Sequence, residues 1–495
     1  MSKIIIQNGN MCELDLPLKF AQKLYNEFAI RHPNAFYLRT RQRGMQNWDG
    51  KIHYITKTGQ FKIGLLPKVY DMCIEMGIKP KVVDMRQPLP KVSKVVTNIG
   101  KYKLRPEQEK AVKSVINNRV GNIPFQIGVL DLTVNFGKTL IMTSLYLSYK
   151  KQLKTLLITN DSDWLNQARE EFKQYLPGED ITFVQGKVLN WSNFTIGMVQ
   201  SISRNMRFYQ KELSQIDMVL IDEADQGGSK QYQNVITRLF NTRIRIGLSG
   251  TIYMSKLAKD KVKNMNLECF FGKVLAEFKL KDSIKKGYST KTVVKMVPGK
   301  PWYGNWESDC ISYKEIYDDS ITNCYTAWLM AYNRLLWNLN QGRYPALVVC
   351  KHIAHCENLY KFFKKKLGDA YNIAYVHVNT PSKLRQQIMK DFREGKIDIL
   401  VSTTIIARGK NFPKLKYLLN TASMDSQEKS IQFLGRLVRT DESKNKVYLD
   451  DLHYPGNYLD RHGKHRKQYY QRQELKVILL DKLWKKHPNH SLIKS

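Results

Sequence analysis

The chain has 495 residues, enough for two to four domains that each bury a core. A hydrophobic content of 42%, with 11% aromatic residues, excludes a largely disordered protein. Lys and Arg number 80 against 44 acidic residues, and the net charge of +36 indicates a polyanionic partner, with nucleic acid as the first candidate. A basic ribosomal or nucleoid-coating protein would share this charge, but it would not need the motifs described below.

The sequence carries no sign of a targeting or membrane-spanning segment. The first apolar run, residues 4–6, is too short for a signal peptide, and no later run is long enough to cross a bilayer. The 7 Cys are odd in number and none lies in a Cys-x-x-Cys pair, which favours reduced thiols over a disulfide framework or a zinc module. We therefore expect a cytoplasmic protein without membrane contact, monomeric in solution.

Residues 1–100 are predicted to form a small α+β N-terminal domain that binds DNA. Apolar residues recur with a helical period over residues 16–30, and short strands are expected around Trp48 and Phe61. Basic and aromatic side chains alternate near these strands, which suits phosphate contacts and stacking. The candidate contacts are Arg41, Arg43, Trp48 and Lys51. A solvated basic face around a buried Trp is the alternative, and residues 88–98 are predicted to be a linker.

A helix is predicted to start at Pro106, because proline is well tolerated in the first helical turn. Gln108 carries an amide donor and acceptor that match an adenine edge. Gln108 is therefore a candidate nucleotide contact, and the family resemblance described below implies the same of Arg105 in the pattern Arg-Pro-x-Gln. A plain helix start explains both residues equally well.

A strand over residues 128–132 is followed by a turn and by a helix over residues 140–149. The turn resembles a phosphate loop, in which backbone N–H groups and a helix N-terminus receive phosphate. In this interpretation Gly137 permits the tight turn, Lys138 reaches the outer phosphates and the Thr139 hydroxyl binds Mg²⁺.

Two positions depart from the phosphate-loop pattern. Leu132 stands at the first Gly position, and Asn135 stands where Gly is common. The candidate nucleotide contacts of this loop are Asn135, Gly137, Lys138 and Thr139, and an incidental strand-turn-helix is the alternative.

Three carboxylates, Asp222, Glu223 and Asp225, follow an apolar strand over residues 219–221. Acids at the carboxyl edge of an open α/β sheet suit a site for a metal and a nucleotide, with Asp222 as a candidate Mg²⁺ ligand. Acids that merely cap a strand in solvent are the alternative.

Polar residues also follow two other strands of this first α/β domain. Gln200, Ser201 and Arg204 are candidates for holding a nucleic-acid backbone, although a helix cap explains each of them too. Ser249 and Thr251 follow a strand over residues 244–248, and we expect their hydroxyls to share a network with Asp225. Ordinary turn chemistry is the alternative for this pair.

Residues 278–455 are predicted to form a second α/β domain. A helical stretch is expected over residues 316–340, and strands are expected over residues 290–297, 346–350, 373–378 and 397–402. The aromatic loop at residues 301–306 contains Trp302, a candidate for stacking on bases or wedging them apart, with a core position as the alternative.

Gln432, Arg436 and Arg439 form the last motif of this domain. The two Arg lie three residues apart on a predicted helix, so both guanidinium groups can point at one γ-phosphate. Two Arg on a solvated helix face are the alternative. Residues 456–495 are predicted to be a basic, helical C-terminal tail in which His462, Arg466 and Tyr470 share one helix face, interpreted as a packing seam.

Taken in order, these motifs resemble those of superfamily 2 helicases over residues 103–452. The resemblance implies an α/β fold with two tandem RecA-like domains, residues 101–277 and 278–455, that use ATP and Mg²⁺. It implies that Asp222 orients the metal and that Glu223 deprotonates the attacking water. The catalytic set that it implies is Lys138, Asp222, Glu223, Gln432, Arg436 and Arg439.

Residues 403–413 resemble helicase motif V, with Asn411 where an Asp is usual. The resemblance implies that Thr403 and Arg408 contact the phosphate backbone. It also implies that Gly409 and Asn411 lie on the nucleotide side.

The tetrapeptide at residues 222–225 spells the signature of the RNA-unwinding DEAD-box family, but Gln432-Phe433 and Ser249-Gly250-Thr251 depart from that family. A closer resemblance is to UvsW-type phage recombination helicases, carried by Trp48-Asp49-Gly50-Lys51 and by the apolar segment at residues 63–66.

The UvsW-type resemblance implies an ATP-dependent DNA helicase that unwinds or branch-migrates forked and four-way-junction DNA, with 3′ to 5′ polarity. It would serve phage replication, recombination or repair in the host cytoplasm, with phage replication and recombination proteins as partners. An RNA helicase of the DEAD-box type and a non-catalytic DNA-binding protein with a decayed ATP site are the alternatives.

Overall fold

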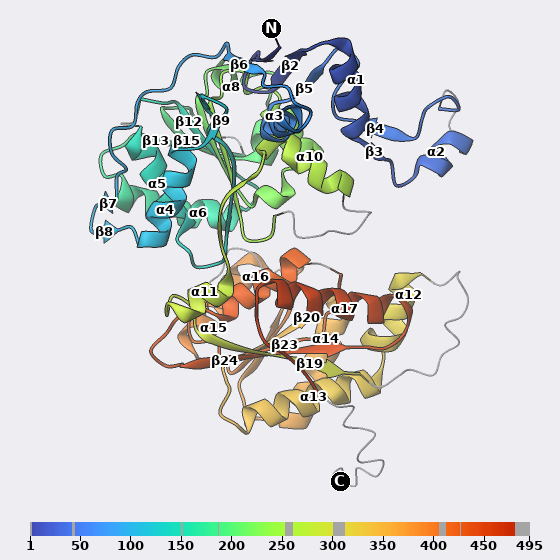
Figure 1. The fold of residues 1–495 in the computed structure, drawn as a ribbon. Helices are drawn as coiled ribbons and strands as arrows, with labels where there is room; N and C mark the ends of the chain where they lie inside the picture. Colours follow the sequence, from blue (N-terminus) through green and yellow to red (C-terminus); the bar gives the residue numbers. More distant parts are fainter. Residues whose placement is uncertain are drawn as a thin grey trace. The chain divides into compact units, whose positions relative to one another are not determined.

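The computed structural model describes residues 2–41, 45–149, 152–186, 188–252, 261–299, 312–404, 412–425 and 427–480. The chain divides into two compact units, which we call the first unit (residues 1–132 and 136–278) and the second unit (residues 133–135 and 279–495). Each unit is built on a mostly parallel sheet with helices on its faces (Figure 1), so the predicted α/β fold with two RecA-like domains is confirmed. The boundaries near residues 100, 277 and 455 stay predictions.

The N-terminal part of the first unit is the predicted α+β region. Its four-stranded sheet has the order β5-β2-β1-β6, and a separate pair is formed by β3 and β4. The strands are β1 (Lys3–Ile6), β2 (Met11–Asp15), β3 (Ala29–Arg31), β4 (Lys51–His53), β5 (Gln60–Lys62) and β6 (Lys81–Asp84). The helices are α1 (Leu18–Glu27), α2 (Ala35–Arg41) and α3 (Leu66–Glu75).

Arg245 ties this N-terminal part to the large sheet of the first unit. Its side chain is fully buried, and Nη2 donates to the carbonyl of Gly9 at 2.6 Å and to Oδ1 of Asn10 at 2.8 Å. A Cβ on Gly9 would stand 2.6 Å from the carbonyl oxygen of Leu239, so glycine is needed for this close approach. The two parts therefore share one hydrophobic core.

The large sheet of the first unit has eight strands in the order β14-β13-β15-β12-β16-β17-β11-β18, parallel except for β14. The strands are β11 (Ile127–Leu132), β12 (Thr155–Thr159), β13 (Ile181–Gln185), β14 (Val188–Leu189), β15 (Phe194–Met198), β16 (Met218–Asp222), β17 (Ile244–Ser249) and β18 (Val274–Phe278). The helices are α4 (Pro106–Ile116), α5 (Lys138–Ser148), α6 (Ser162–Tyr175), α7 (Val199–Arg204), α8 (Gln210–Ser214), α9 (Lys230–Ile236) and α10 (Lys261–Phe271). Two short ribbons pair β7 (Asn98–Ile99) with β8 (Tyr102–Lys103) and β9 (Arg119–Val120) with β10 (Ile123–Pro124). The central strands are apolar runs buried on both faces, as a parallel sheet requires.

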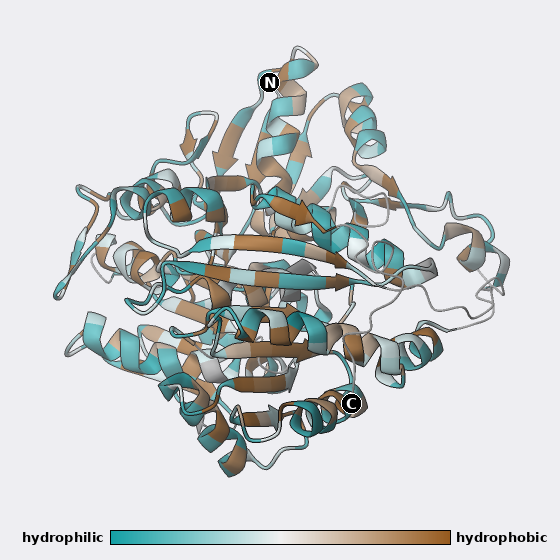
Figure 2. Ribbon diagram, turned by 90° about the horizontal axis from the view of Figure 1, so that it is seen from below, coloured by the Kyte–Doolittle hydropathy of each residue, from teal (hydrophilic) through white to brown (hydrophobic). Residues whose placement is uncertain are grey.

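The second unit has a seven-stranded parallel sheet in the order β21-β22-β20-β23-β24-β19-β25. The strands are β19 (Lys291–Pro298), β20 (Ala346–Cys350), β21 (Ile373–Val376), β22 (Ile399–Thr403), β23 (Tyr417–Asn420), β24 (Lys446–His453) and β25 (Val477–Leu479). The helices are α11 (Leu280–Lys285), α12 (Tyr313–Tyr317), α13 (Tyr325–Leu339), α14 (Ile353–Leu367), α15 (Ser382–Glu394), α16 (Gln427–Leu437) and α17 (Asn457–Arg472). Figure 2 shows the strands largely in brown and the helices in mixed teal and brown, the pattern of buried strands under amphipathic helices.

The prediction of one helical stretch over residues 316–340 is wrong. A π-helical turn at Asp318–Thr322 follows α12, and the chain is extended at Cys324 before α13 begins. The indole N–H of Trp328 donates to the carbonyls of Ile321 and Thr322, which stabilises the break by using carbonyls that a continuous helix would bond internally.

Within the described ranges, none of the helices combines the length and the apolar content that crossing a membrane requires. The six described cysteines are unpaired and buried, in agreement with the expected reduced thiols.

Candidate nucleotide and nucleic-acid sites

The candidate phosphate loop between β11 and α5 has the backbone that its sequence requires. Helix α5 begins at Lys138, two residues earlier than predicted, and its N-cap Gly137 has a φ of 82°, in the left-handed region. Asn135 also has a positive φ of 65°, a conformation that Asn tolerates better than most side chains. The departure at Asn135 therefore agrees with the local turn.

Gln108 contacts this loop directly. Its Nε2 donates to the carbonyl of Phe136 at 2.6 Å, and its Oε1 accepts the backbone N–H of Arg105 at 2.8 Å. The side chain is 2% exposed, and the predicted helix start at Pro106 is confirmed. In the structure Gln108 therefore couples α4 to the phosphate loop, and the adenine contact of Arg105 and Gln108 stays a prediction.

Gly137→Ala is expected to lower ATP hydrolysis at least about tenfold. An added Cβ would stand 2.5 Å from Nε2 of Gln108, and a left-handed non-glycine residue costs roughly 1–2 kcal/mol. Gly178→Ala is the matched control, because Gly178 also has a positive φ of +78° but nothing lies within 4 Å of the added atom. Steady-state ATPase assays of both variants test this, and equal rates would contradict it.

The acidic strand end lies at the carboxyl edge of the same sheet. Strand β16 ends at Asp222, and Glu223 takes a left-handed φ of 52° before a 3₁₀ turn at Ala224–Gln226. Such strain in a non-glycine residue is typical of functional positions.

The charges of the acids and of Lys138 influence the pKa values at this edge. Burial, followed by the charges of Asp222, Asp225 and Asp161, raises the pKa of Glu223 to about 8, and the Lys138 ammonium lowers it. Burial also raises the pKa of Asp222, again against Lys138. A carboxyl whose pKa lies near neutrality is suited to accept a proton from water.

The predicted network around Asp225 is confirmed. Ser249 Oγ donates to Asp225 Oδ1 at 2.6 Å, and the N–H of Thr251 donates to Ser249 Oγ at 3.1 Å. Both Asp225 and Ser249 are buried, so this network joins the ends of β16 and β17.

Gln200, Ser201 and Arg204 lie on α7, directly after β15. Gln200 Nε2 donates to the carbonyl of Asn160 at 3.4 Å, and Ser201 Oγ accepts the N–H of Gly186 at 2.9 Å, whereas Arg204 is exposed. The sequence pattern did not predict the bond that extends this cluster to a third strand end. Asn160 Nδ2 donates to Gln226 Oε1 at 2.6 Å, which connects the ends of β12, β15 and β16.

Of the N-terminal candidates, Arg41 ends α2, Lys51 begins β4, and Trp48 lies between these two elements. Trp48 is half-buried, and its indole N–H donates to the carbonyl of Lys51 at 2.9 Å, which stabilises the turn; its contact with DNA stays a prediction. Arg41 is exposed and lies 4.8 Å from the ring centre of Tyr37. Lys51 is exposed, and Arg43 lies outside the described residues.

Several candidates of the second unit lie outside the described residues, namely Trp302, Arg408, Gly409 and Asn411. Thr403 is buried at the carboxyl end of β22, where the motif places it.

The prediction that Arg436 and Arg439 share one helix is wrong. Gln432 and Arg436 lie on α16, which ends at Leu437, two residues before Arg439. Thr290 donates hydrogen bonds to the next two carbonyls of the chain. Its N–H donates to the carbonyl of Val438 at 2.8 Å, and its Oγ1 donates to the carbonyl of Arg439 at 2.9 Å. These bonds to the start of β19 draw the chain out of the helix.

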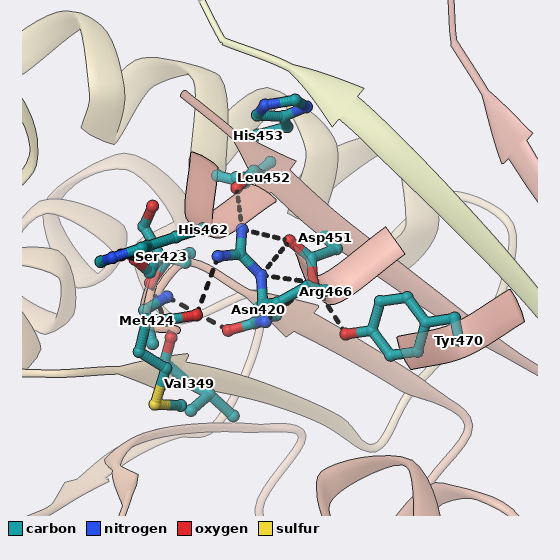
Figure 3. A network of polar contacts seen from close by, with 12 residues as sticks. Val349, Asn420, Ser423, Met424, Asp451, Leu452, His453, His462, Arg466 and Tyr470 are labelled. Carbon is teal, nitrogen blue, oxygen red and sulfur yellow. Dashed lines mark hydrogen bonds and ion pairs between the residues drawn. The ribbon is translucent and has the colours of Figure 1, made fainter. Parts of the chain in front are cut away.

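The His462-Arg466-Tyr470 face is a packing seam, as predicted. Figure 3 shows the Arg466 guanidinium enclosed by Asp451 and two carbonyls, with Tyr470 bonding the same carboxylate. Arg466 Nη2 donates to Asp451 Oδ1 at 2.8 Å and Nη1 donates to the carbonyl of Met424 at 3.0 Å, while Tyr470 OH donates to Asp451 Oδ2 at 2.7 Å. Helix α17 thereby holds the segment at Met424 that leads into α16.

Two family models match the chain, one mainly in the first unit and one in the second. Residues 101–254 match the family described as Type III restriction enzyme, res subunit, and residues 329–441 match the helicase conserved C-terminal domain. The chain belongs to the superfamily 2 helicases.

Similar proteins cover much of this helicase. The protein named "Putative helicase 22" of Sulfolobus islandicus filamentous virus is 22% identical over 385 residues, 71% of this chain and 64% of that protein. The ATP-dependent Type ISP restriction-modification enzyme LlaBIII, solved bound to DNA, is 15% identical with a TM-score of 0.57, covers 81% of this chain and 33% of that chain, and shows the shared fold. The crystal structure of T4 UvsW is 19% identical with a TM-score of 0.44 and covers 97% of this chain and 98% of that chain. This helicase spans 64% and 51% of the length of the first curated relatives that it matches.

Proposed function

We propose that this helicase hydrolyses ATP to unwind or branch-migrate forked and four-way-junction DNA, with 3′ to 5′ polarity, in phage replication, recombination or repair. The observation that carries the ATPase is the geometry of one edge of the first sheet, where left-handed Gly137 starts α5 at Lys138 and where β16 ends at Asp222. DNA as the substrate is supported by the surplus of 36 positive charges and by the UvsW-type pattern at Trp48-Asp49-Gly50-Lys51.

The residues at this edge fit ATP with Mg²⁺. Left-handed Gly137 at the start of α5 is the backbone that a phosphate loop needs, and Lys138 supplies an ammonium for the outer phosphates. The Thr139 hydroxyl and the Asp222 carboxylate are the oxygen donors that Mg²⁺ prefers. Bound Mg²⁺ neutralises charge that develops on the phosphates.

Glu223 positions and deprotonates the attacking water in this proposal. Its raised pKa of about 8 lets the carboxyl hold the proton that the water loses. Gln432, Arg436 and Arg439 of the second unit are proposed to complete hydrolysis, because fixed guanidinium groups stabilise charge on a transferring phosphoryl group.

Polar residues at or just after the carboxyl ends of parallel strands are proposed to contact the nucleic-acid backbone. Gln200, Ser201 and Arg204 would hold the backbone on the first unit, and Thr403 and Arg408 would hold it on the second. Gly409 and Asn411 are proposed for the nucleotide side, and the N-terminal Arg41 and Lys51 are proposed to contact phosphates.

ATP hydrolysis should be stimulated several-fold by forked DNA, and more than by a plain duplex of the same length. Steady-state ATPase assays with forked DNA, a four-way junction, duplex DNA and duplex RNA, each with an unwinding assay, test this expectation. Stimulation by RNA alone would point to an RNA helicase, and DNA binding without hydrolysis would point to a decayed ATP site.

A further inference from the structure

A group of cations surrounds two aromatic rings on the second unit, apart from the motifs described above. We call it the cationic patch and define it by Lys295, Arg334, Trp337, Arg343, Lys446 and Tyr448. Three cations approach the Trp337 ring, with Lys295 Nζ at 4.8 Å, Arg334 Cζ at 5.0 Å and Arg343 Cζ at 4.8 Å from its centre. Arg343 also lies 3.6 Å from the centre of the Tyr448 ring, and Lys446 lies 5.8 Å from it.

The fold brings these side chains together through strand register. In the parallel pair of β19 and β24, Val293 is opposite Tyr448 and Lys295 is opposite Asp450. Alternate residues of a strand point to one face, so Lys446, Tyr448 and Asp450 share the face on which Lys295 lies. Arg334 and Trp337 are three residues apart on α13 and share one side of that helix.

Among the charges that act on Lys295, three cations stand against one carboxylate. Burial is the largest cause that lowers the pKa of Lys295; Asp450 raises it, and Arg334, Arg343 and Lys446 lower it further. The Asp450 carboxylate already accepts hydrogen bonds from Arg334 Nε at 3.0 Å, Asn338 Nδ2 at 3.1 Å and Tyr417 OH at 3.1 Å. The mutual repulsion of these cations would be relieved by an anion from outside.

The patch is open to such a partner. Trp337 is 42% exposed and Lys446 is exposed, whereas Lys295, Arg343 and Tyr448 are half-buried. Cation–π contacts hold the side chains over the rings and so reduce the entropy that phosphate binding would cost. Several cations held close together match the closely spaced charges of a phosphate backbone better than they match a single small anion.

The patch lies far from Thr403, the described backbone candidate of this unit. Tyr448 is opposite Tyr417 of β23, which is opposite Ala346 of β20, so the patch lies at the amino ends of these strands. Thr403 is opposite Cys350, at the carboxyl ends. Four residues along the strands and three strand spacings across the sheet separate them, which makes about 20 Å at roughly 3.3 Å per residue and about 4.8 Å per strand. The patch and Thr403 therefore cannot contact the same phosphates.

We propose that the cationic patch binds the phosphate backbone of a second DNA segment, a duplex arm of the branched substrate. The inference rests on the proposed function for the branched DNA. It adds a second binding site, which holds one arm of the DNA while the backbone contacts proposed above hold another.

The test compares two double variants of the full chain. Lys295→Ala/Lys446→Ala removes two charges of the patch, and Lys383→Ala/Lys390→Ala removes two charges from α15. The buried apolar residues of α15 belong to one hydrophobic cluster of the second unit, while those of α13 belong to another. Binding to labelled forked DNA and to a plain single strand is measured by fluorescence anisotropy across a salt series. The charge-retaining Lys295→Arg/Lys446→Arg variant controls for damage to the fold.

The patch variant should bind forked DNA about 5–10-fold more weakly, with a salt dependence shallower by about 1.8 in log–log slope for two lost phosphate contacts. Single-strand affinity and single-strand-stimulated ATPase should stay at the wild-type level, and the Arg variant should retain fork affinity. A fork affinity that falls no further than in the α15 control overturns the inference. Wild-type protein without ATPase activity would instead refute the proposed function, and the binding comparison would still decide the patch.

Discussion

Glu223→Gln is expected to lower the turnover of ATP by about 10²–10⁴-fold, the usual contribution of a general base. The amide keeps the size of the side chain, but it cannot take the proton from water. Burial and three neighbouring carboxylates, which raise the pKa of Glu223, therefore have no proton acceptor to act on in this variant. Lys138→Ala should lose turnover as well, since it removes the ammonium proposed for the outer phosphates. DNA binding should persist in both variants, because neither residue is among the proposed nucleic-acid contacts.

The measurement is DNA-stimulated ATP hydrolysis at saturating forked DNA, paired with DNA binding by anisotropy. Glu170→Gln is the matched control, since Glu170 is an exposed acid on α6 whose ion pair with Lys173, at 3.6 Å, joins two surface side chains. The control should hydrolyse ATP at the wild-type rate. Undiminished hydrolysis in Glu223→Gln or Lys138→Ala would refute the assignment of the ATP site.

The parallel sheets could be predicted from sequence because their strands are short apolar runs with polar residues just after them. Strand β20 begins and ends at the predicted residues, and the acidic end of β16 lies at the expected edge. The order of the motifs along the chain then predicts which edge carries the candidate site, since parallel strands end on the same side of a sheet.

What escaped prediction depends on contacts between residues far apart in the chain. Arg245 lies in an otherwise apolar strand, and its partners Gly9 and Asn10 are 236 and 235 residues away, so no local pattern marks it as an anchor. The end of α16 before Arg439 follows from bonds to Thr290, 149 residues earlier. The Asn160–Gln226 bond joins two amides in separate turns, and neither turn has a periodic signal.

Arg466→Ala is expected to destabilise the helicase by about 3–5 kcal/mol, the usual cost of breaking a buried ion pair from one side. Arg466 and Asp451 are both fully buried, and Asp451 also accepts bonds from Tyr470 OH at 2.7 Å and Asn420 Nδ2 at 3.0 Å. Without the guanidinium, the Asp451 carboxylate would stay buried without its cation. The carbonyl of Met424 would also lose the donor that holds the approach to α16.

Urea unfolding followed by circular dichroism measures this loss, with Lys464→Ala as the control on the same helix. Lys464 pairs with Asp460 at the surface, so its removal should cost no more than about 1 kcal/mol. Tyr470→Phe should lie between the two, because it removes one hydrogen bond to a charged group, worth about 1.5–3 kcal/mol. If Arg466→Ala unfolds at the same urea concentration as Lys464→Ala, the seam does not hold α17 to the sheet. Position 470 would then be expected to tolerate Phe without loss, since both effects depend on the same buried carboxylate.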